Sequence, residues 1–508
     1  MIKLIMLNSI YLKNFKSFKE LKELELKPIT ILSGTNSCGK SSILQSILLL
    51  KQTLESKNIN QTALLNGRFV HLGVFENLIY EKNAKESITF RLKFKISKED
   101  YSAKARGDIP LHYYLRDLLS EEHYDLPKAE YLFTYTITLK ISDSEKKKSY
   151  VKPIKVESIH YLSEIVTQEK KKYKGSEISI CENLDNKIDN LFTISWKNLT
   201  NKRFDKEGSE KSGSEKGTIR FINLFPSNFE FNNGENITRD FFPIEITFHY
   251  FQQLLRYTTS KISYIGPLRE EPSRRYIYED EVIEIGIKGE NAAYIFLSEQ
   301  DEIIEKLFFF DSNTEKFIPE SNISLAEAIR KWTTLMNING FKADPQNELI
   351  QLNLDSNSGK KTTVNIADVG FGVSQIFPII LEGIRIPHGG TLLLEQPEIH
   401  LHPNLQMQLA DYLLALALSG KNIIAETHSD HLINRLIRRI VEDNVYNLRD
   451  LVAIYFIRPS ENGAFFEEIE IDAVNGIINW PDDFFDQTAS EQEKIIKASI
   501  SKRQSLRK

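Results

Sequence analysis

The chain has 508 residues and a formal net charge of −5, and 41% of its residues are hydrophobic and 10% aromatic. This composition supports a sizeable core and excludes a wholly disordered protein. The two cysteines, Cys38 and Cys181, exclude a disulfide framework and a cysteine zinc cluster. No apolar run approaches the roughly 18 residues of a membrane span, and the opening stretch is too short for a signal peptide. We therefore expect a cytoplasmic protein without membrane contact.

The N-terminal region predicts two strands and a helix around a glycine-containing loop. Residues 9–18 place Ile10, Leu12 and Phe18 on one face of a half-buried strand and its turn. A second apolar strand, residues 29–33, runs into the loop. Residues 41–54 then carry apolar side chains at helical spacing.

The middle of the chain predicts antiparallel strands, because residues 88–165 are rich in β-branched and aromatic side chains. Residues 201–217 hold five basic, four acidic, three Gly and three Ser residues, which predicts a flexible surface loop. Residues 55–365 show no sustained heptads, so we expect no coiled-coil arm.

Strands and helices alternate again near the C-terminus. Residues 390–394 and 421–425 predict short buried strands, and residues 402–418 predict the helix between them. Alternation at both ends of the chain indicates a parallel sheet assembled from distant segments. The tail Thr488–Lys508 has six Lys or Arg against two Glu, which suits either a contact strip or a solvated helix.

The most specific motif runs from Gly34 to Ser41 and fits G-x-x-x-x-G-K-[ST]. Its backbone N–H groups would curl around phosphate oxygens, and the helix start adds partial positive charge. Lys40 would neutralise the β- and γ-phosphates, and the Ser41 hydroxyl would ligate Mg²⁺. A plain glycine-rich turn is the alternative, and Cys38 is expected to pack within the loop.

A second motif places Glu395 directly after the apolar strand, followed by Gln396, Glu398, His400 and His402. An acid in this position would hold the Mg²⁺ that Ser41 coordinates only in part. A zinc cluster is the competing interpretation, but no third His or Cys follows at ligand spacing.

Two further segments suit a phosphate site. Thr427-His428-Ser429 follows the strand at 421–425, at the sheet edge where nucleotides bind in such folds. Gly370, Gly372, Ser374 and Gln375 open an apolar, helix-like run. The histidine alone is also compatible with a structural role, and the glycines with an ordinary helix cap.

These four elements, in this order, resemble the ABC-type ATPase head of the SMC/RecF/OLD superfamily. The segments NFKSF, EQPEIHLHP and ETHS are similar to those of stand-alone RecF-like or OLD-like ATPases, and residues 65–73 and 264–276 match a subgroup of them. Residues 475–486 resemble a C-terminal domain of unknown function that some of these ATPases carry.

The resemblance implies an α/β P-loop NTPase fold, with an ABC-type ATPase head, an antiparallel β subdomain and a long β-rich insertion. It divides the chain into an N-terminal half of the head, a β-rich insertion, a C-terminal half of the head and a C-terminal extension. These parts would span residues 1–90, 91–260, 261–440 and 441–508.

The resemblance also implies roles for single residues. Glu395 would be the Walker B acid, a Mg²⁺ ligand with Ser41, and His428 the switch histidine. Gly370 to Gln375 would be the signature segment that reaches the γ-phosphate in the opposite protomer. The nucleotide contacts would be Gly34, Asn36, Ser37, Cys38, Gly39, Lys40, Ser41, Ser42, Gly370, Gly372 and Gln375.

Three residues depart from the pattern of the superfamily. Glu395 stands where Asp is usual, and Phe371 occupies the usual signature Ser position. Gln396 replaces the usual catalytic Glu, and an amide cannot accept a proton as a base. Glu398 is an alternative base.

The implied function is an ATP- and Mg²⁺-dependent, slowly hydrolysing ATPase that forms a head-to-head homodimer and acts on DNA. Genome maintenance or anti-phage defence with a separately encoded nuclease would fit, because we recognise no nuclease motif after His428. The alternative is a nucleotide-dependent scaffold that holds or releases a toxic effector. Arg269, Arg274 and Arg275 would contact phosphates of nucleotide or DNA, or form salt bridges between lobes.

Overall fold

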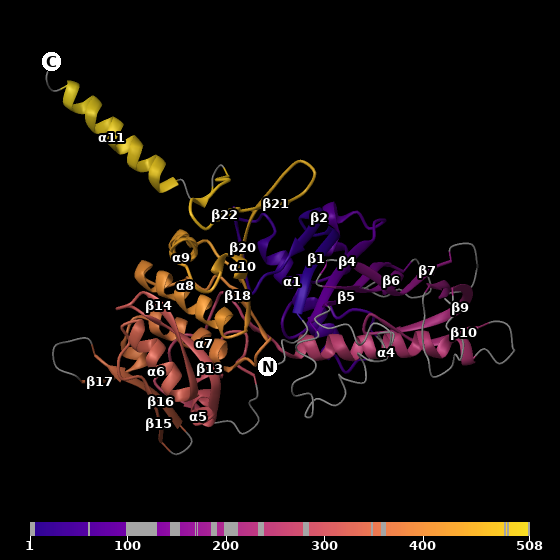
Figure 1. The fold of residues 1–508 in the computed structure, drawn as a ribbon, viewed down its shortest axis with the longest axis horizontal. Helices are drawn as coiled ribbons and strands as arrows, with labels where there is room; N and C mark the ends of the chain where they lie inside the picture. The colour runs from indigo at the N-terminus through magenta and orange to yellow at the C-terminus, as the bar shows by residue number, and fades with distance from the viewer. Residues whose placement is uncertain are drawn as a thin grey trace.

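The fold is described from a computed structural model (Figure 1). The described residues are 6–58, 61–97, 130–142, 153–167, 169, 171–183, 190–197, 212–231, 238–277, 284–346, 349–356, 362–481, 484 and 487–505.

A six-stranded sheet forms the centre of the molecule. Its order is β11-β18-β19-β3-β20-β21; the first five strands are parallel and β21 is antiparallel to β20. Its strands are β3 (Ile29–Gly34), β11 (Ile262–Ile265), β18 (Thr391–Glu395), β19 (Asn422–Glu426), β20 (Val452–Arg458) and β21 (Phe465–Glu468). The predicted parallel sheet built from distant segments is confirmed.

A second, antiparallel sheet of nine strands extends from the N-terminus through the middle of the chain, in the order β10-β9-β8-β7-β6-β5-β4-β1-β2. Its strands are β1 (Met6–Phe15), β2 (Phe18–Glu25), β4 (Ile88–Ser97), β5 (Glu130–Ile141), β6 (Ile154–Val166), β7 (Lys172–Glu182), β8 (Leu191–Lys197), β9 (Gly213–Ile222) and β10 (Phe225–Phe231). The predicted boundary at 90/91 falls inside β4, which hydrogen-bonds to both β1 and β5.

The expected flexible loop at 201–217 needs a correction at its C-terminal end. Residues 213–217 belong to β9 and pair with β8, and the backbone of Gly213 lies against the Trp196 ring. Polar residues fit this strand because their side chains lie mostly on its exposed positions. Residues 201–211 lie outside the described residues.

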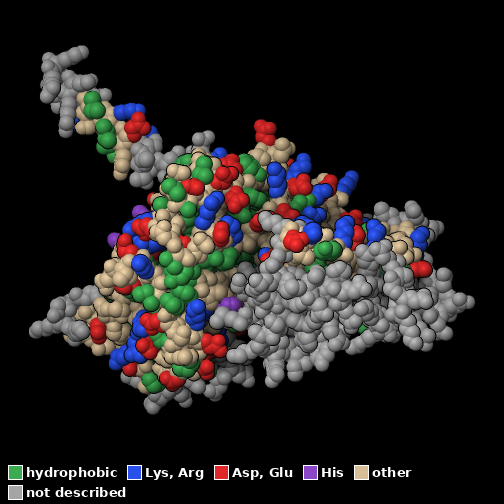
Figure 2. All heavy atoms as spheres, viewed as in Figure 1, with side chains coloured by type: hydrophobic (Ala, Val, Ile, Leu, Met, Phe, Trp, Pro, Cys, Tyr) green, Lys and Arg blue, Asp and Glu red, His purple; other side chains and the backbone are tan. Residues whose placement is uncertain are grey.

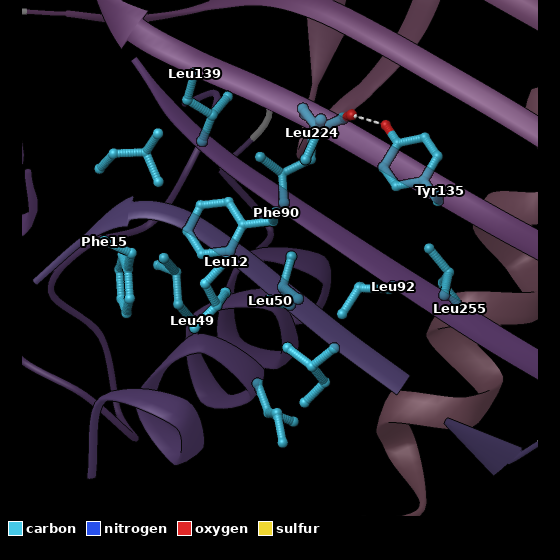
Figure 3. Packing of buried hydrophobic residues seen from close by; sticks show 14 of the residues in the cluster. Leu12, Phe15, Leu49, Leu50, Phe90, Leu92, Tyr135, Leu139, Leu224 and Leu255 are labelled. Atoms are coloured by element: carbon cyan, nitrogen blue, oxygen red, sulfur yellow. Dashed lines mark hydrogen bonds between the residues drawn. The ribbon is translucent and has the colours of Figure 1, made fainter. Parts of the chain in front are cut away.

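One hydrophobic core fills the space between the two sheets. It contains α1 (Lys40–Glu55) and α4 (Thr238–Ser260), which contact each other, and the apolar face of the nine-stranded sheet. Figure 3 shows Leu49 and Leu50 of α1 beside Phe90 of β4, and the Tyr135 hydroxyl donating to the Leu224 carbonyl over 2.6 Å. This packing fixes α1, and with it the loop that precedes the helix.

A second core covers the other face of the parallel sheet, so that Leu32 faces the first core and its neighbour Ile31 the second. Its helices are α5 (Ala292–Glu299), α6 (Leu325–Leu335), α7 (Phe371–Arg385), α8 (Pro403–Leu418) and α9 (Asp430–Glu442). Its small strands are β12 (Tyr276–Ile277), β13 (Ile303–Asp311), β14 (Lys316–Ser324), β15 (Lys342–Gln346), β16 (Leu349–Asp355) and β17 (Thr363–Asn365). Short 3₁₀ turns are η1 (Phe75–Leu78), η2 (Tyr80–Lys82) and η4 (Ile366–Asp368).

The C-terminal extension is built into the head. The predicted boundary at 440/441 lies within α9, and β20 inserts into the central sheet beside β3. The remaining elements are α10 (Leu448–Leu451), β22 (Ile471–Asp472), β23 (Gly476–Ile477) and α11 (Gln487–Ser505). The last helix, α11, projects away from the body of the molecule (Figure 1), and its described side chains are exposed.

The described middle of the chain consists of strands β4 to β10 and helix α4, in place of a coiled-coil arm. Among the described helices, none is both long and apolar enough to cross a membrane. Acidic and basic side chains are mixed over the described part of the face shown in Figure 2, and no strongly basic patch is visible among them.

Candidate nucleotide site

Two glycines allow the loop between β3 and α1 to approach its neighbours closely. Gly34 has a φ of 145°, and a Cβ atom there would lie 2.1 Å from the Ile457 carbonyl oxygen of β20. Gly39 has a φ of 108°, and a Cβ atom there would lie 2.0 Å from Ser17 Oγ. Larger residues are therefore excluded at both ends of the loop by backbone conformation and by space.

Lys40 begins α1, and its ammonium group lies inside the curl of the loop. Nζ donates to the carbonyl oxygens of Gly34 at 3.1 Å and Thr35 at 2.6 Å, and Cys38 Sγ is 3.8 Å away. The Lys40 side chain is 3% exposed. The positive charge of Lys40 therefore lies inside the curve of the loop backbone, which is the arrangement that phosphate binding requires.

The other predicted loop residues fall into two groups. Asn36 and Ser37 are exposed at the tip of the loop, and Ser37 has a φ of 60°. Cys38 and Ser42 are buried, and the Ser42 N–H donates to the Gly39 carbonyl. The structure therefore brings the predicted residues together around one loop, with the two buried side chains supporting it.

Two carboxylates lie at the ends of adjacent parallel strands. Glu395 of β18 is opposite Glu426 of β19 in the register. Burial and the nearby charge of Glu426 raise the pKa of Glu395 to about 7, while a hydrogen bond with Tyr264 and the Lys16 charge oppose this shift. Burial also raises the pKa of Glu426, against a hydrogen bond with Ser41 and the charge of Lys40.

Glu426 was missed by the sequence analysis, although it precedes Thr427-His428-Ser429 directly. The available signal was its position directly after a predicted strand, just as Glu395 follows another predicted strand. Lys16 was also missed: burial lowers its pKa, and the nearby Glu395 charge counteracts that shift. Lys16 lies in the turn between β1 and β2, and its ammonium group donates a hydrogen bond to Gln45 Oε1.

Glu398 connects the second motif to the loop that carries His428. Its Oε1 accepts a hydrogen bond of 2.6 Å from the His428 backbone N–H, and burial raises its pKa. Burial lowers the pKa of the half-buried His428 imidazole, and the Lys40 charge lowers it further. Glu398 therefore holds the loop that carries His428, and the neutral form of the imidazole is favoured.

Arg269 contacts the turn that follows β18. Its guanidinium group donates to the carbonyl oxygens of Gln396, Pro397 and Ile399 over 3.3–3.5 Å, and its Nε donates to Gln375 Oε1 over 3.2 Å. It is 6% exposed, and burial lowers its pKa to about 10. Arg269 is thus a link between the second motif and α7, rather than a surface contact for phosphate.

The other two arginines of the predicted group are exposed. Arg274 forms an ion pair with Asp368, with one N–O distance of 3.0 Å, and the Arg275 side chain is exposed. The structure therefore separates Arg269 from Arg274 and Arg275.

The predicted signature segment surrounds the start of α7. Gly370 precedes the helix, with open space where its Cβ would be, and Phe371 is 51% exposed. A Cβ at Gly372 would lie 3.3 Å from the His400 carbonyl oxygen. Gln375 is buried and its amide bonds to Arg269 and to the Glu270 carbonyl, so it supports the segment from inside.

The donor set at the loop suits Mg²⁺ with a nucleotide. Ser41, Glu395 and Glu426 offer hard oxygen ligands, and Mg²⁺ typically completes its coordination with water and substrate phosphates. Glu426 Oε2 is buried and has no hydrogen-bond partner among the described residues, so this oxygen is free to coordinate a cation. No group of three or more His, Cys, Asp or Glu side chains gathers as a metal cluster in the described parts of the chain.

Similarity to known proteins agrees with this geometry. The model of the family described as AAA ATPase domain matches residues 6–433. An uncharacterized protein of Methanocaldococcus jannaschii is 28% identical over 102 residues, which are 19% of this chain and 44% of that protein. The matched stretch therefore spans less than half of that relative.

Solved structures of SMC heads align along most of the chain at low similarity. The SMC head domain from Thermotoga maritima has 10% identity and a TM-score of 0.34, covering 92% of this chain and 100% of that chain. The head domain with an extended coiled coil from Pyrococcus furiosus, bound to the C-terminal domain of ScpA, has 10% identity and a TM-score of 0.38, covering 97% and 100%.

The family match and the sheet architecture confirm the predicted fold class, a P-loop ATPase head of α/β type with a large antiparallel sheet. The match covers more than half of the chain, from the first strand to α9. The chain therefore belongs to the AAA ATPase domain family.

Proposed function

We propose that this protein binds ATP with Mg²⁺, hydrolyses it slowly, and uses the bound nucleotide to close a head-to-head homodimer. The observation that carries the proposal is the convergence of Lys40 and Ser41 with Glu395 and Glu426 at one end of the parallel sheet. These groups supply the cation, the hydroxyl and the acids that a Mg²⁺–ATP site needs.

The chemistry of each group follows from its position. Lys40 would neutralise phosphate charge, and the backbone of the loop would cradle the phosphates. Ser41 and Glu395 would hold Mg²⁺, which would supply neutralisation of phosphate charge. His428 lies at the same sheet edge, where its imidazole would contact the γ-phosphate. Gln396 would orient water without accepting its proton, which makes hydrolysis slow.

The start of α7 supports the dimer. Gly370 borders open space and Phe371 is exposed, so the segment presents its backbone and one ring to the surface. The helix start offers N–H groups to an anion. In the proposed dimer this surface meets the nucleotide in the opposite protomer, through Gly370 and Gly372, while Gln375 supports it from below.

Sedimentation of the purified protein tests the proposal. Addition of ATP with Mg²⁺ to the wild type should produce a dimer, and ADP should produce much less of it. Equal association with ATP, with ADP and without nucleotide would contradict ATP-gated closure.

The proposed cellular role is action on DNA with a separately encoded effector nuclease, of the kind used in anti-phage defence. Exposed Arg275, and Arg274 if it exchanges Asp368 for a phosphate, are the candidate DNA contacts. Double-stranded DNA should then stimulate ATP turnover by the wild type, and this stimulation should fall when Arg275 and Arg274 are both changed to Ala.

A second candidate is a nucleotide-dependent scaffold for a toxic effector. The observation that favours it is α11, on which Ile495, Ile496 and Ile500 are 65%, 60% and 51% exposed. Exposed apolar side chains at this spacing are typical of surfaces that bind other proteins. If DNA changes neither ATP turnover nor dimerisation, this candidate is favoured over the first.

A further inference from the structure

The end of β19 carries an acid that the P-loop motif does not explain. Glu426 is 4% exposed, is close enough to the Ser41 hydroxyl for that group to lower its pKa, and is paired with Glu395 in the register of the two strands. Neighbouring strands lie about 4.8 Å apart, so acids at paired positions are side by side. We propose that Glu426 is a second carboxylate of the Mg²⁺–ATP site, which binds the cation together with Ser41 and Glu395. The inference rests on the proposed function, because the cation arrives with the nucleotide.

An unpartnered oxygen supports this assignment. Glu426 Oε2 is buried and has no hydrogen-bond partner in the described structure, a costly arrangement for a carboxylate. Lys40 is near enough to lower the pKa of Glu426, but its ammonium group already donates to the carbonyls of Gly34 and Thr35. A divalent cation between Glu426 and Glu395 would satisfy the free oxygen and separate the two like charges.

Among the described residues, Asp411 and Glu382 are the other two acids as deeply buried as Glu426. Asp411 bonds to Arg439 Nε over 2.8 Å, and Glu382 bonds to Arg385 Nη1 over 3.1 Å. Both are therefore neutralised by an arginine of the same chain. Glu426 instead faces a second acid, which is unfavourable for folding and favourable for binding a cation.

The test measures ATP affinity by calorimetry on the full chain, once with Mg²⁺ and once with EDTA. The variants are Glu426→Gln and, as a control for the loss of a buried carboxylate, Glu382→Gln. Mg²⁺ should raise the affinity of the wild type and of the control. Glu426→Gln should lose at least about tenfold of this gain, the scale seen when a group that supports a metal ligand is removed. Its ATP affinity in EDTA should match that of the wild type.

Thermal unfolding without nucleotide separates a ligand from a structural acid. In EDTA, Glu426→Gln should melt at or above the wild-type temperature, because the variant removes one of two neighbouring like charges. Glu426→Asp keeps the charge with a shorter side chain and should retain part of the Mg²⁺-dependent gain. It also keeps the test decisive if the Gln variant does not fold.

Two results would overturn the inference. The first is a full Mg²⁺-dependent gain in ATP affinity in Glu426→Gln. The second is a wild-type gain in ATP affinity in Glu426→Asp, together with a Glu426→Gln variant that melts far below the wild type. Failure of the proposed function looks different. In that case Lys40→Ala would bind ATP as tightly as the wild type. Loss of ATP binding in Lys40→Ala with a full Mg²⁺ gain in Glu426→Gln would remove only the role of Glu426.

Discussion

Gln396 occupies the position at which the proposed ATPase site would need a base. Its backbone has a φ of 45°, its N–H donates to the Glu426 carbonyl over 2.8 Å, and its carbonyl accepts from Arg269. These contacts involve only the backbone, so the turn does not depend on the side chain being an amide. A glutamate of the same length therefore fits the position and would add the ability to accept a proton.

We expect Gln396→Glu to raise ATP turnover with little change in ATP affinity. General base catalysis is typically worth about 10²–10⁴-fold, and the gain should lie within that range. Steady-state phosphate release from the wild type, Gln396→Glu and Glu395→Gln measures it, and Glu395→Gln should lower Mg²⁺-dependent hydrolysis. If the wild type already hydrolyses rapidly and Glu398→Gln stops it, Glu398 is the base.

Lys421 gives the stability of the fold a pH dependence of its own. The side chain is 5% exposed, its ammonium group donates to the carbonyls of Gly383 and Ile384 at the end of α7, and burial lowers its pKa from 10.5 to about 7. The folded state thus holds this proton less tightly than the unfolded chain. The contribution of this group to stability is complete above about 10.5 and is lost as the pH falls through about 7.

The melting temperature of the wild type should therefore rise more between about pH 7 and 9 than that of Lys421→Met, which has no titrating group there. Thermal unfolding in buffers of equal ionic strength measures the two slopes. Identical slopes would show that Lys421 keeps its proton in the folded protein.

Side chains that precede or follow a recognisable strand could be predicted from the sequence. Lys40, Glu395 and His428 lie where the motifs put them, because each motif is short and its strand fixes the side chain. Glu426 follows a predicted strand and could have been found this way, but its pairing with Glu395 depends on the register of β18 and β19. The contacts of Arg269 could not be predicted, because it bonds to carbonyls more than 120 residues away in the chain.

At the scale of elements, Arg269 joins the turn after β18 to α7. The same guanidinium group donates to three carbonyls of residues 396–399 and to the Gln375 amide of the helix. A rearrangement of this turn on nucleotide binding would therefore be transmitted to the start of α7 through one rigid, planar group. Lysine cannot make this set of bonds, because it has a single nitrogen.

We expect Arg269→Lys to bind ATP nearly as tightly as the wild type but to lose ATP-dependent dimerisation. It should also unfold more easily, by about 1–3 kcal/mol, because buried carbonyls lose their donors. Calorimetry, sedimentation and denaturant unfolding measure the three effects, and Arg275→Ala serves as the exposed control. Unchanged dimerisation in Arg269→Lys would show that the turn and α7 are not coupled through this residue.

Elements with a clear local pattern could be predicted to within about one residue at each end. The strand–helix alternation identified β3, α1, β18, α8 and β19, because the strands are short apolar runs and the helices repeat apolar residues at helical spacing. The polar, charged strand at 213–217 was expected to be a loop, since its composition has no apolar alternation. Its structure comes from hydrogen bonds to β8 and β10, which a local pattern does not contain.

For the molecule as a whole, the start of α7 is the surface through which the proposed dimer would form. Gly370 has an ordinary φ of −56° and open space around its missing side chain. A larger residue there should leave the fold intact and obstruct only what lies outside the protomer. Gly370 is thus a better steric probe than Gly372, whose Cβ would already touch the His400 carbonyl.

Gly370→Leu should bind ATP as the wild type does and form much less of the ATP-dependent dimer. Lys22→Leu, which introduces the same side chain at an exposed position of β2, should leave the dimer unchanged. Sedimentation with ATP and Mg²⁺ compares the three proteins. Dimerisation of Gly370→Leu at the wild-type level would place the interface elsewhere on the head.

Calorimetric titration with ATP measures whether the nucleotide binds in the loop between β3 and α1. The wild type and Lys22→Ala, an exposed-lysine control, should bind one ATP per protomer. Lys40→Ala should bind none measurably, because it removes the ammonium group from the centre of the phosphate cradle while keeping a residue that favours the helix. Wild-type affinity in a folded Lys40→Ala variant would contradict the account.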